Sequence, residues 1–171
     1  MKTRQGFVSN SSSSSFVIAL AAKPTTTVEV QALLFGPNQI SYDHPYTDGG
    51  FATSLVADVV REDLEKTEPL TLKQLVDELS NGWLFYDQVH REIPDLPHYA
   101  PMEECRVVWG QQSERTRELS KQLAQSFLAR PDVRGKQVFA LEYSDNDGAL
   151  RSAMEHGDLF HNVPHIQISH H

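Results

Sequence analysis

The sequence predicts a single α/β domain spanning residues 1–171, in which helices cover a mixed sheet of about four strands. Three observations lead to this prediction. The 171 residues suffice for one hydrophobic core and are short for two domains. Apolar runs of strand length lie near both ends of the chain, and amphipathic helical patterns lie between them. Within the domain we distinguish a serine-rich segment (residues 1–15) and an acidic, mostly helical insertion (residues 50–104).

The first predicted strand is the apolar run from Phe16 to Ala22. Both of its faces are apolar, so we expect a central, buried strand. It follows directly on the serine run Ser11–Ser15. That run has three interpretations, which the sequence leaves open: a flexible spacer, an anion-binding loop, or a site of phosphorylation.

Two amphipathic helices are predicted in the middle of the chain, where the insertion lies. Apolar residues recur at helical spacing from Leu55 to Leu64, with Thr53 or Ser54 as the N-cap. A second helix begins at Thr71, whose spacing to Gln74 fits a capping box.

The segments around these helices are less regular. Residues 27–35 fit either a helix or a strand. Residues 83–86 include three aromatic side chains and are expected on a further helical turn, packed in the core. Three prolines predict an extended loop over residues 93–101. This loop and residues 41–50 are candidate lids over a site, or ordinary surface connections.

A βαβ unit is predicted in the C-terminal half. Cys105–Trp109 fits a short buried strand, Ser113–Arg130 an amphipathic helix, and Gln137–Tyr143 a second buried strand. This order is typical of a right-handed crossover between parallel strands. His165–Ser169 alternates and is expected as a final edge strand.

Charge and cysteine content narrow the classes of function. Residues 58–104 hold twelve acids and four bases, a net charge of −8, whereas the remainder holds eleven of each. An acidic middle without a basic stripe argues against nucleic-acid binding and favours either solvated helix faces or a surface for a basic partner. The single cysteine, Cys105, predicts a reducing, cytoplasmic location. No segment approaches the length of a membrane-spanning helix.

The parallel strands predict where a small-molecule or phosphoester site would lie. Ligands of open α/β sheets bind beyond the carboxyl ends of the strands. Gln111 and Gln112 follow one predicted strand, and Ser144 follows the next. We therefore expect these three residues to bind the ligand.

Side chains that can bind a metal ion follow the last of these predicted strands, because five of the eight histidines lie within the last sixteen residues. Imidazole and carboxylate together suit a divalent transition metal. The candidate ligands are Asp145, Asp147, His156, His161 and His165. Their spacing matches no compact metal motif, and Pro164 argues against a helix joining the last two histidines. The alternatives are a polar turn and a loosely ordered tail.

A second chemistry for the same region needs no metal. Glu155 and His156 are adjacent and could form an acid–base pair, with the carboxylate orienting the imidazole. These two residues are the candidate catalytic groups. The alternative is that the histidines bond nearby carbonyls and water.

Both ends of the chain carry recognisable strings. The opening is Gly6-Phe7-Val8-Ser9-Asn10 followed by the serine run and Phe16, and the closing block contains residues 142–148, 155–158 and 168–171. The opening resembles the start of assorted uncharacterised bacterial and phage proteins, and the closing block resembles the end of one such group. The resemblance implies no activity, cofactor or site residue.

Two functions from different classes follow from the sequence. The first is a cytosolic enzyme acting on a small molecule or phosphoester, with or without a metal. The second is a non-catalytic interaction protein, associated with a phage or mobile element, that binds through its acidic middle, the cluster Trp83–Tyr86 or its serine-rich start.

Overall fold

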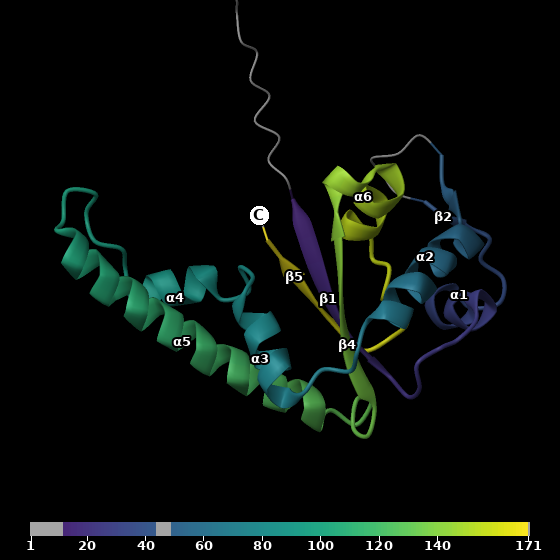
Figure 1. Cartoon of the computed structure of the whole chain (residues 1–171), viewed down its shortest axis with the longest axis horizontal. Helices are drawn as coiled ribbons and strands as arrows, with labels where there is room; N and C mark the ends of the chain where they lie inside the picture. The colour runs from purple at the N-terminus through teal and green to yellow at the C-terminus, as the bar shows by residue number, and fades with distance from the viewer. Residues whose placement is uncertain (1–11, 44–48, 171) are drawn as a thin grey trace, which may run out of the picture.

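The computed structural model describes residues 12–43 and 49–170. Its elements form one α/β arrangement, shown in Figure 1. In chain order they are β1 (Ser13–Leu20), α1 (Thr27–Phe35), β2 (Ser41–Tyr42), β3 (Phe51–Ala52), α2 (Thr53–Lys66), α3 (Leu72–Ser80), α4 (Tyr86–Glu92), α5 (Met102–Ala129), β4 (Gln137–Ser144), the 3₁₀ turn η1 (Asp145–Asp147), α6 (Ala149–His156) and β5 (His165–Ser169).

The main sheet has three strands in the order β4-β1-β5, and β1 is central as its two apolar faces predicted. Both neighbours run antiparallel to β1, with Phe16 opposite Leu141 on one side and Gln167 on the other. The predicted parallel βαβ unit is therefore wrong. A separate two-stranded sheet pairs β2 with β3, so the predicted mixed sheet of about four strands is replaced by two antiparallel sheets.

The expected strand Cys105–Trp109 is also wrong, because these residues belong to α5. The predicted helix Ser113–Arg130 is the second half of the same helix. The run is apolar, but on a helix its members reach solvent, and Val107 and Trp109 are both about half exposed. The short apolar run thus resembled a buried strand. Its residues instead continue a long helix, although Val107 and Val108 are β-branched and favour strands.

Helices cover both faces of the main sheet. Phe16, Ile18 and Leu20 of β1 share one core with residues of α1, α2 and α6, whereas Val17 and Ala19 share a second core with α3 and the C-terminal half of α5. This alternation follows from the period of two in an extended strand. The architecture therefore has three layers, with the sheet in the middle (Figure 1).

The serine run enters the central strand. Ser13 begins β1, and Ser14 and Ser15 are buried. The Ser15 hydroxyl is hydrogen-bonded to Nε2 of His170 across the sheet, at 2.9 Å. For residues 13–15 the spacer interpretation is wrong, since paired strand residues cannot act as a flexible tail. Residues 1–11, which carry most of the serine-rich segment and the opening string, lie outside the described residues, as do residues 44–48 and 171.

Helix α3 begins as predicted. The Thr71 hydroxyl accepts a hydrogen bond from the amide of Gln74, and the Gln74 side chain accepts one from the Thr71 amide. This reciprocal capping box satisfies two donors that the first helical turn leaves unpaired. The ambiguous residues 27–35 form α1, which a second capping box between Thr26 and Glu29 initiates. The acidic insertion is thus mostly helical, as the sequence predicts.

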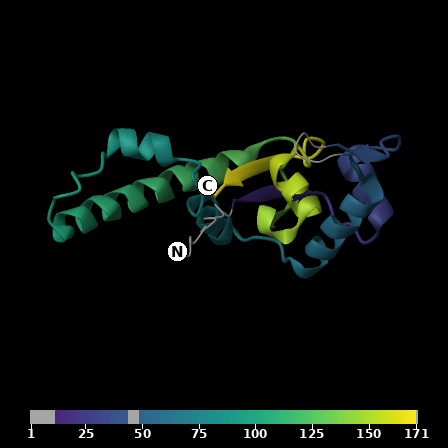
Figure 2. The same cartoon turned by 90° about the horizontal axis from the view of Figure 1, so that it is seen from above.

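The N-terminal half of α5 extends away from the sheet. With 28 residues, α5 is about 42 Å long at 1.5 Å per residue. Only its second half lies against the core, and its first half projects beside α4 and the proline loop 93–101 (Figures 1 and 2). We call α4, this loop and the α5 residues Met102–Gln112 the helical arm.

Candidate functional site

The predicted acidic turn, residues 144–148, lies at one end of the sheet and is hydrogen-bonded to Ser12. The Ser144 hydroxyl donates to the carbonyl of Ser12 (3.0 Å), and a carboxylate oxygen of Asp145 accepts from the Ser12 amide (3.2 Å). Both side chains therefore join the end of β4 to the start of β1. Asp147 is exposed on the same turn.

Glu155 and His156 are brought together at the end of α6. The Glu155 side chain is fully buried, and His156 Nε2 lies 3.6 Å from one of its carboxylate oxygens. Neither oxygen has a hydrogen-bond partner among the residues that the structure describes. The two predicted catalytic residues are thus close together, and the buried carboxylate is without the hydrogen bonds that usually hold a buried charge.

The remaining predicted metal ligands are occupied locally. His161 donates from Nδ1 to the carbonyl of Asp158 (2.8 Å), and His165 donates from Nδ1 to that of Val163 (3.0 Å). Within residues 12–43 and 49–170, no three or more His, Cys, Asp or Glu side chains gather closely enough to hold a metal ion. The five candidate ligands therefore share no common site in this structure.

The two glutamines lie far from the predicted ligand edge. Both belong to α5, which packs on the opposite face of the sheet from α6. Gln112 is buried and donates from Nε2 to the carbonyl of Ile93 (3.0 Å) and to a carboxylate oxygen of Asp95 (2.9 Å). The expectation that they lie beside Ser144 is wrong, because it depended on parallel strands.

A second, partly buried polar cluster joins β4, α2 and α6. Arg151 donates to one carboxylate oxygen of Asp63 (3.2 Å), and its guanidinium lies 5.7 Å from the centre of the Tyr143 ring. Burial, and then the charge of Asp63, raise the pKa of Tyr143. The Tyr143 hydroxyl and the other Asp63 oxygen have no partner among the described residues. This arrangement stays neutral at the tyrosine and offers no activated nucleophile.

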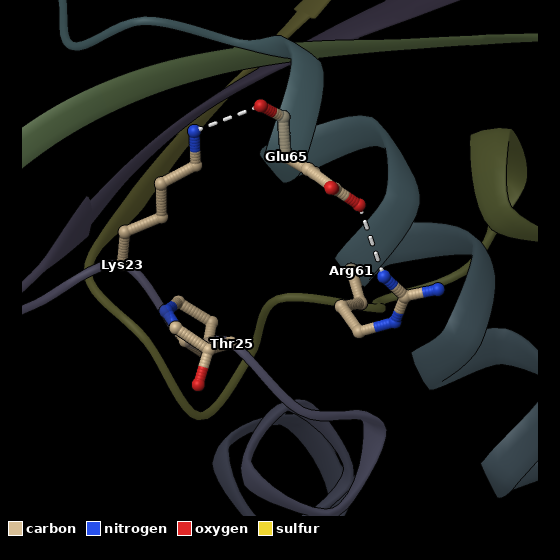
Figure 3. A pocket seen from close by; sticks show the side chains of 5 residues that line it. Lys23, Thr25, Arg61 and Glu65 are labelled. Atoms are coloured by element: carbon tan, nitrogen blue, oxygen red, sulfur yellow. Dashed lines mark hydrogen bonds and ion pairs between the residues drawn. The ribbon is translucent and has the colours of Figure 1, made fainter.

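A cavity of about 300 Å³ opens where β1 leads into α1, and five residues line it: Lys23, Pro24, Thr25, Arg61 and Glu65 (Figure 3). Lys23 Nζ donates to the carbonyls of Glu65 (3.1 Å) and Thr67 (3.0 Å), which are at the end of α2. Arg61 donates to the Glu65 carboxylate (3.1 Å). Both cations are thus already bonded to acceptors of the chain itself.

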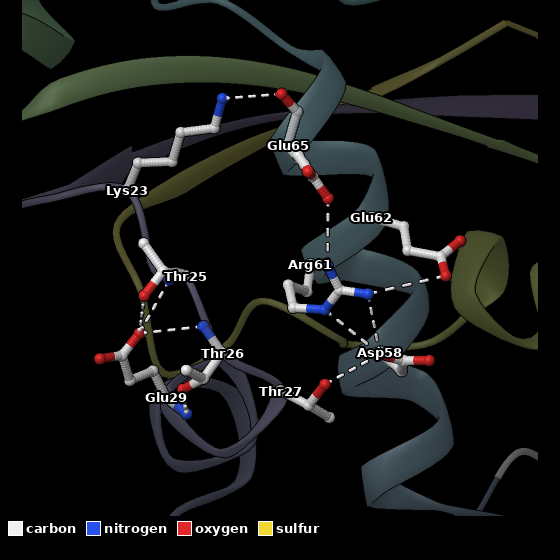
Figure 4. A network of polar contacts seen from close by, with 9 residues as sticks. All are labelled: Lys23, Thr25, Thr26, Thr27, Glu29, Asp58, Arg61, Glu62 and Glu65. Carbon is white, nitrogen blue, oxygen red and sulfur yellow. Dashed lines mark hydrogen bonds and ion pairs between the residues drawn. The ribbon is translucent and has the colours of Figure 1, made fainter.

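The surrounding polar network explains why this cavity is a structural junction (Figure 4). Asp58 accepts from the Thr27 hydroxyl at 2.8 Å and from Arg61, so that it links α1 to α2. These hydrogen bonds, that of Thr27 first, lower the pKa of Asp58, and the bond to Asp58 raises the pKa of Arg61. The network connects secondary structure elements and leaves no unpaired cation to attract an anion.

A second hollow, of about 360 Å³, lies between α4 and α5. We call it the aromatic groove. Trp83, Tyr86 and Trp109 line it and are 52%, 42% and 51% exposed. The ring centres of Trp83 and Tyr86 are 4.4 Å apart, and those of Tyr86 and His90 are 3.8 Å apart. Three aromatic rings are thus stacked along one wall.

Backbone and side-chain bonds fix this groove in place. The Trp83 amide donates to the carbonyl of Ser169 on the edge strand β5 (2.9 Å). Gly82 fits closely there, because a Cβ at this position would collide with the side chain of Ile168. His90 Nδ1 donates to the carbonyl of Tyr86 (2.9 Å). The groove is therefore attached to the sheet and has a defined shape before anything binds.

Exposed apolar side chains concentrate on this part of the molecule. Of the ten large apolar residues that are exposed among the described residues, six lie between residues 83 and 109. They are Trp83, Tyr86, Tyr99, Met102, Val107 and Trp109. A concentration of this kind marks binding surfaces, because scattered exposed residues are normal and clustered ones are not.

The sequence indicated these residues but not their exposure. Residues 83–86 were expected in the core and 105–109 in a buried strand, and both predictions are wrong for Trp83, Tyr86 and Trp109. One signal could have found Trp109. The apolar residues at 107, 108 and 109 are consecutive, so on a helix they cannot all face one side.

Comparison with known proteins found no matching family model and no curated protein or solved structure with significant similarity to the chain. In the part of the chain that the structure describes, no helix is both long enough and apolar enough to cross a bilayer.

Proposed function

We propose that this chain is a protein-interaction module that binds its partner through the helical arm. The observation that carries the proposal is the exposure of Trp83, Tyr86 and Trp109 around one groove. Tryptophan and tyrosine are the residues that most often dominate binding energy, because they bury large apolar areas with little loss of side-chain freedom. Covering three of them would recover roughly 25 cal/mol for each Å² of apolar area removed from water.

The arm also has the rigidity that an interface needs. The buried Gln112 side chain holds the proline loop through Ile93 and Asp95, and Arg115 of α5 pairs with Glu92 of α4 at 2.7 Å. These contacts order the arm in the free protein. Binding to a surface that is already ordered costs less conformational entropy.

A phosphoester or metal site is not part of this proposal. Gln111 and Gln112 lie in α5 rather than beside Ser144, and the predicted metal ligands gather at no common site among the described residues. The cytosolic location inferred from the single cysteine remains part of the proposal, as does a protein partner in preference to a nucleic acid.

The test places a photo-crosslinking amino acid at position 86 in the full-length protein and expresses it in the source cells. The control carries the same amino acid at position 40, because Ile40 is 83% exposed and lies off the arm. We expect one adduct that forms from position 86 and not from position 40. The cross-linked protein is then identified, purified and mixed with the unmodified chain.

The complex must reform from the two purified proteins, and Trp109→Ala must weaken it by about tenfold or more, as for an interface hot spot. Ile40→Ala must leave its affinity unchanged. Identical adducts from both positions, or a complex indifferent to Trp109→Ala, would overturn the proposal.

A further inference from the structure

We propose that the segment docking in the aromatic groove is a basic amphipathic helix of the partner. This inference rests on the proposed function and adds the chemistry of the partner. Apolar side chains of such a helix would fill the groove between α4 and α5, and its lysines and arginines would contact the acidic residues around it. A helix lying in an apolar groove is a common mode of recognition between proteins.

The charge of the arm supports a basic partner. Its residues 86–112 hold five acids and two bases, a net charge of −3, and all five acids lie in the stretch 58–104 that carries the whole excess of −8. Asp87 of α4 and Glu103 and Glu104 of α5 are exposed. Among the described residues, none of these three carboxylates forms an ion pair. Unpaired acids on the helices that form the groove attract cations to this part of the surface.

The aromatic rings add a second attraction for cations. The faces of tryptophan and tyrosine attract ammonium and guanidinium groups through the ring quadrupole, with tryptophan the strongest. Trp83 and Tyr86 are stacked and still about half exposed. An arginine or lysine of the partner can therefore lie over a ring while its aliphatic stem stays in the groove.

The same charges argue against a second copy of this chain as the occupant. A symmetric dimer through the arm would bring two surfaces of net charge −3 together. Like charges across an interface are unfavourable, and desolvation strengthens the repulsion. An acidic peptide would meet the same repulsion.

The chain offers its own reporter for a direct test. It contains two tryptophans, Trp83 and Trp109, and both line the groove. A helix that covers them shifts their fluorescence to shorter wavelength. The probes are two peptides of about 18 residues with the same leucine stripe, one with lysine and arginine and the other with glutamate at the polar positions.

We expect the basic peptide to bind the full-length protein at least about tenfold more tightly than the acidic one. Its affinity should fall as salt rises from about 50 to about 300 mM. Calorimetry with Tyr86→Ala, which keeps both tryptophans, should show a loss of about tenfold. Ile40→Ala is the matched control and should bind as the unaltered chain does.

A matched pair of charge variants isolates the electrostatic part. Replacing Asp87 and Glu104 with lysine should abolish the preference for the basic peptide, whereas replacing Glu142 and Asp147, exposed acids outside the arm, should keep it. Equal binding of both peptides, or a dimer in sedimentation that Tyr86→Ala dissociates, overturns the inference. If the cross-linked partner still reforms its complex, the proposed function survives that result. If it does not, both fail.

Discussion

Replacing the buried Glu155 with methionine should stabilise the fold. The Glu155 side chain is fully buried, and neither carboxylate oxygen has a hydrogen-bond partner among the described residues. A buried polar group without a partner costs about 1–3 kcal/mol, and removing it in favour of an apolar group of similar shape removes that cost. Methionine and glutamate have similar helix propensities, so α6 itself should be unaffected.

One interaction offsets part of the gain. Glu155 pairs with His156 at 3.6 Å, and the imidazole is 32% exposed, so solvent screens the pair. A screened pair of this kind contributes about 0–1 kcal/mol. The net gain in the free energy of unfolding is therefore about 0–3 kcal/mol. For a chain of this length, a gain of that size raises the melting temperature by up to roughly 10 °C.

Thermal and urea denaturation at neutral pH measure the effect, with an unchanged urea slope showing that the unfolding transition is the same. Glu114→Met is the control, because Glu114 is an exposed glutamate on α5; it should change stability by less than about 0.5 kcal/mol. A loss of more than about 1 kcal/mol in Glu155→Met would refute the reasoning, since it would mean that the carboxylate holds a stabilising partner.

Three further predictions concern other parts of the fold. Gly82→Ala should lower the free energy of unfolding by about 1–3 kcal/mol, because the added Cβ collides with Ile168 of β5. Gly110→Ala has open space around it in α5 and should raise the free energy of unfolding by about 0.5–1 kcal/mol, and urea denaturation compares the two variants. Tyr42→Phe should cost about 1 kcal/mol in thermal unfolding, because the Tyr42 hydroxyl donates to an α6 carbonyl at 3.1 Å, whereas Tyr143→Phe should cost nothing; an equal loss in both would contradict this. Asp58→Asn should destabilise the protein at neutral pH. Since the folded pKa of Asp58 is lowered, its contribution is present above the ordinary aspartate pKa and is lost as the pH falls through the lowered value, so the deficit should shrink below about pH 4; a constant deficit in pH-dependent melting would contradict it.

The buried strands were predictable because their signal is local. The apolar runs at Phe16–Ala22 and Gln137–Tyr143 overlap β1 and β4, and the alternation at His165–Ser169 coincides with β5. The capping box at Thr71 likewise fixes where α3 starts. Each of these depends on residues that are neighbours in the chain, so no tertiary context is needed to infer them.

Strand direction was not predictable, because it depends on what connects the strands. The run Cys105–Trp109 looked like the first strand of a crossover, and that misreading made the sheet parallel. The burial of the aromatic residues was also predicted wrongly. Apolar residues were expected in the core, but Trp83 and Trp109 are about half exposed. A sequence shows which residues are apolar, and only the packing shows which of them remain uncovered.

The metal site predicted near the C-terminus was wrong for a related reason. Glu155 and His156 are neighbours in the chain and lie close together, but His161 and His165 form hydrogen bonds with backbone carbonyls of their own turns. Histidines in turns find backbone carbonyls nearby, so their abundance alone does not predict a shared ligand.

The single long helix α5 sets a gradient of local stability. Its C-terminal half is held in the core by Ala124 and Phe127, whereas residues 102–112 rely on hydrogen bonds propagated from that half and on the few contacts of the arm. Backbone amides should therefore exchange with solvent progressively faster from Phe127 towards Met102. A ligand that covers Trp109 would slow amide exchange most in the first turns of α5, where exchange in the free protein is fastest. The exchange rate of these amides would thus report, without a label, how much of the arm is occupied.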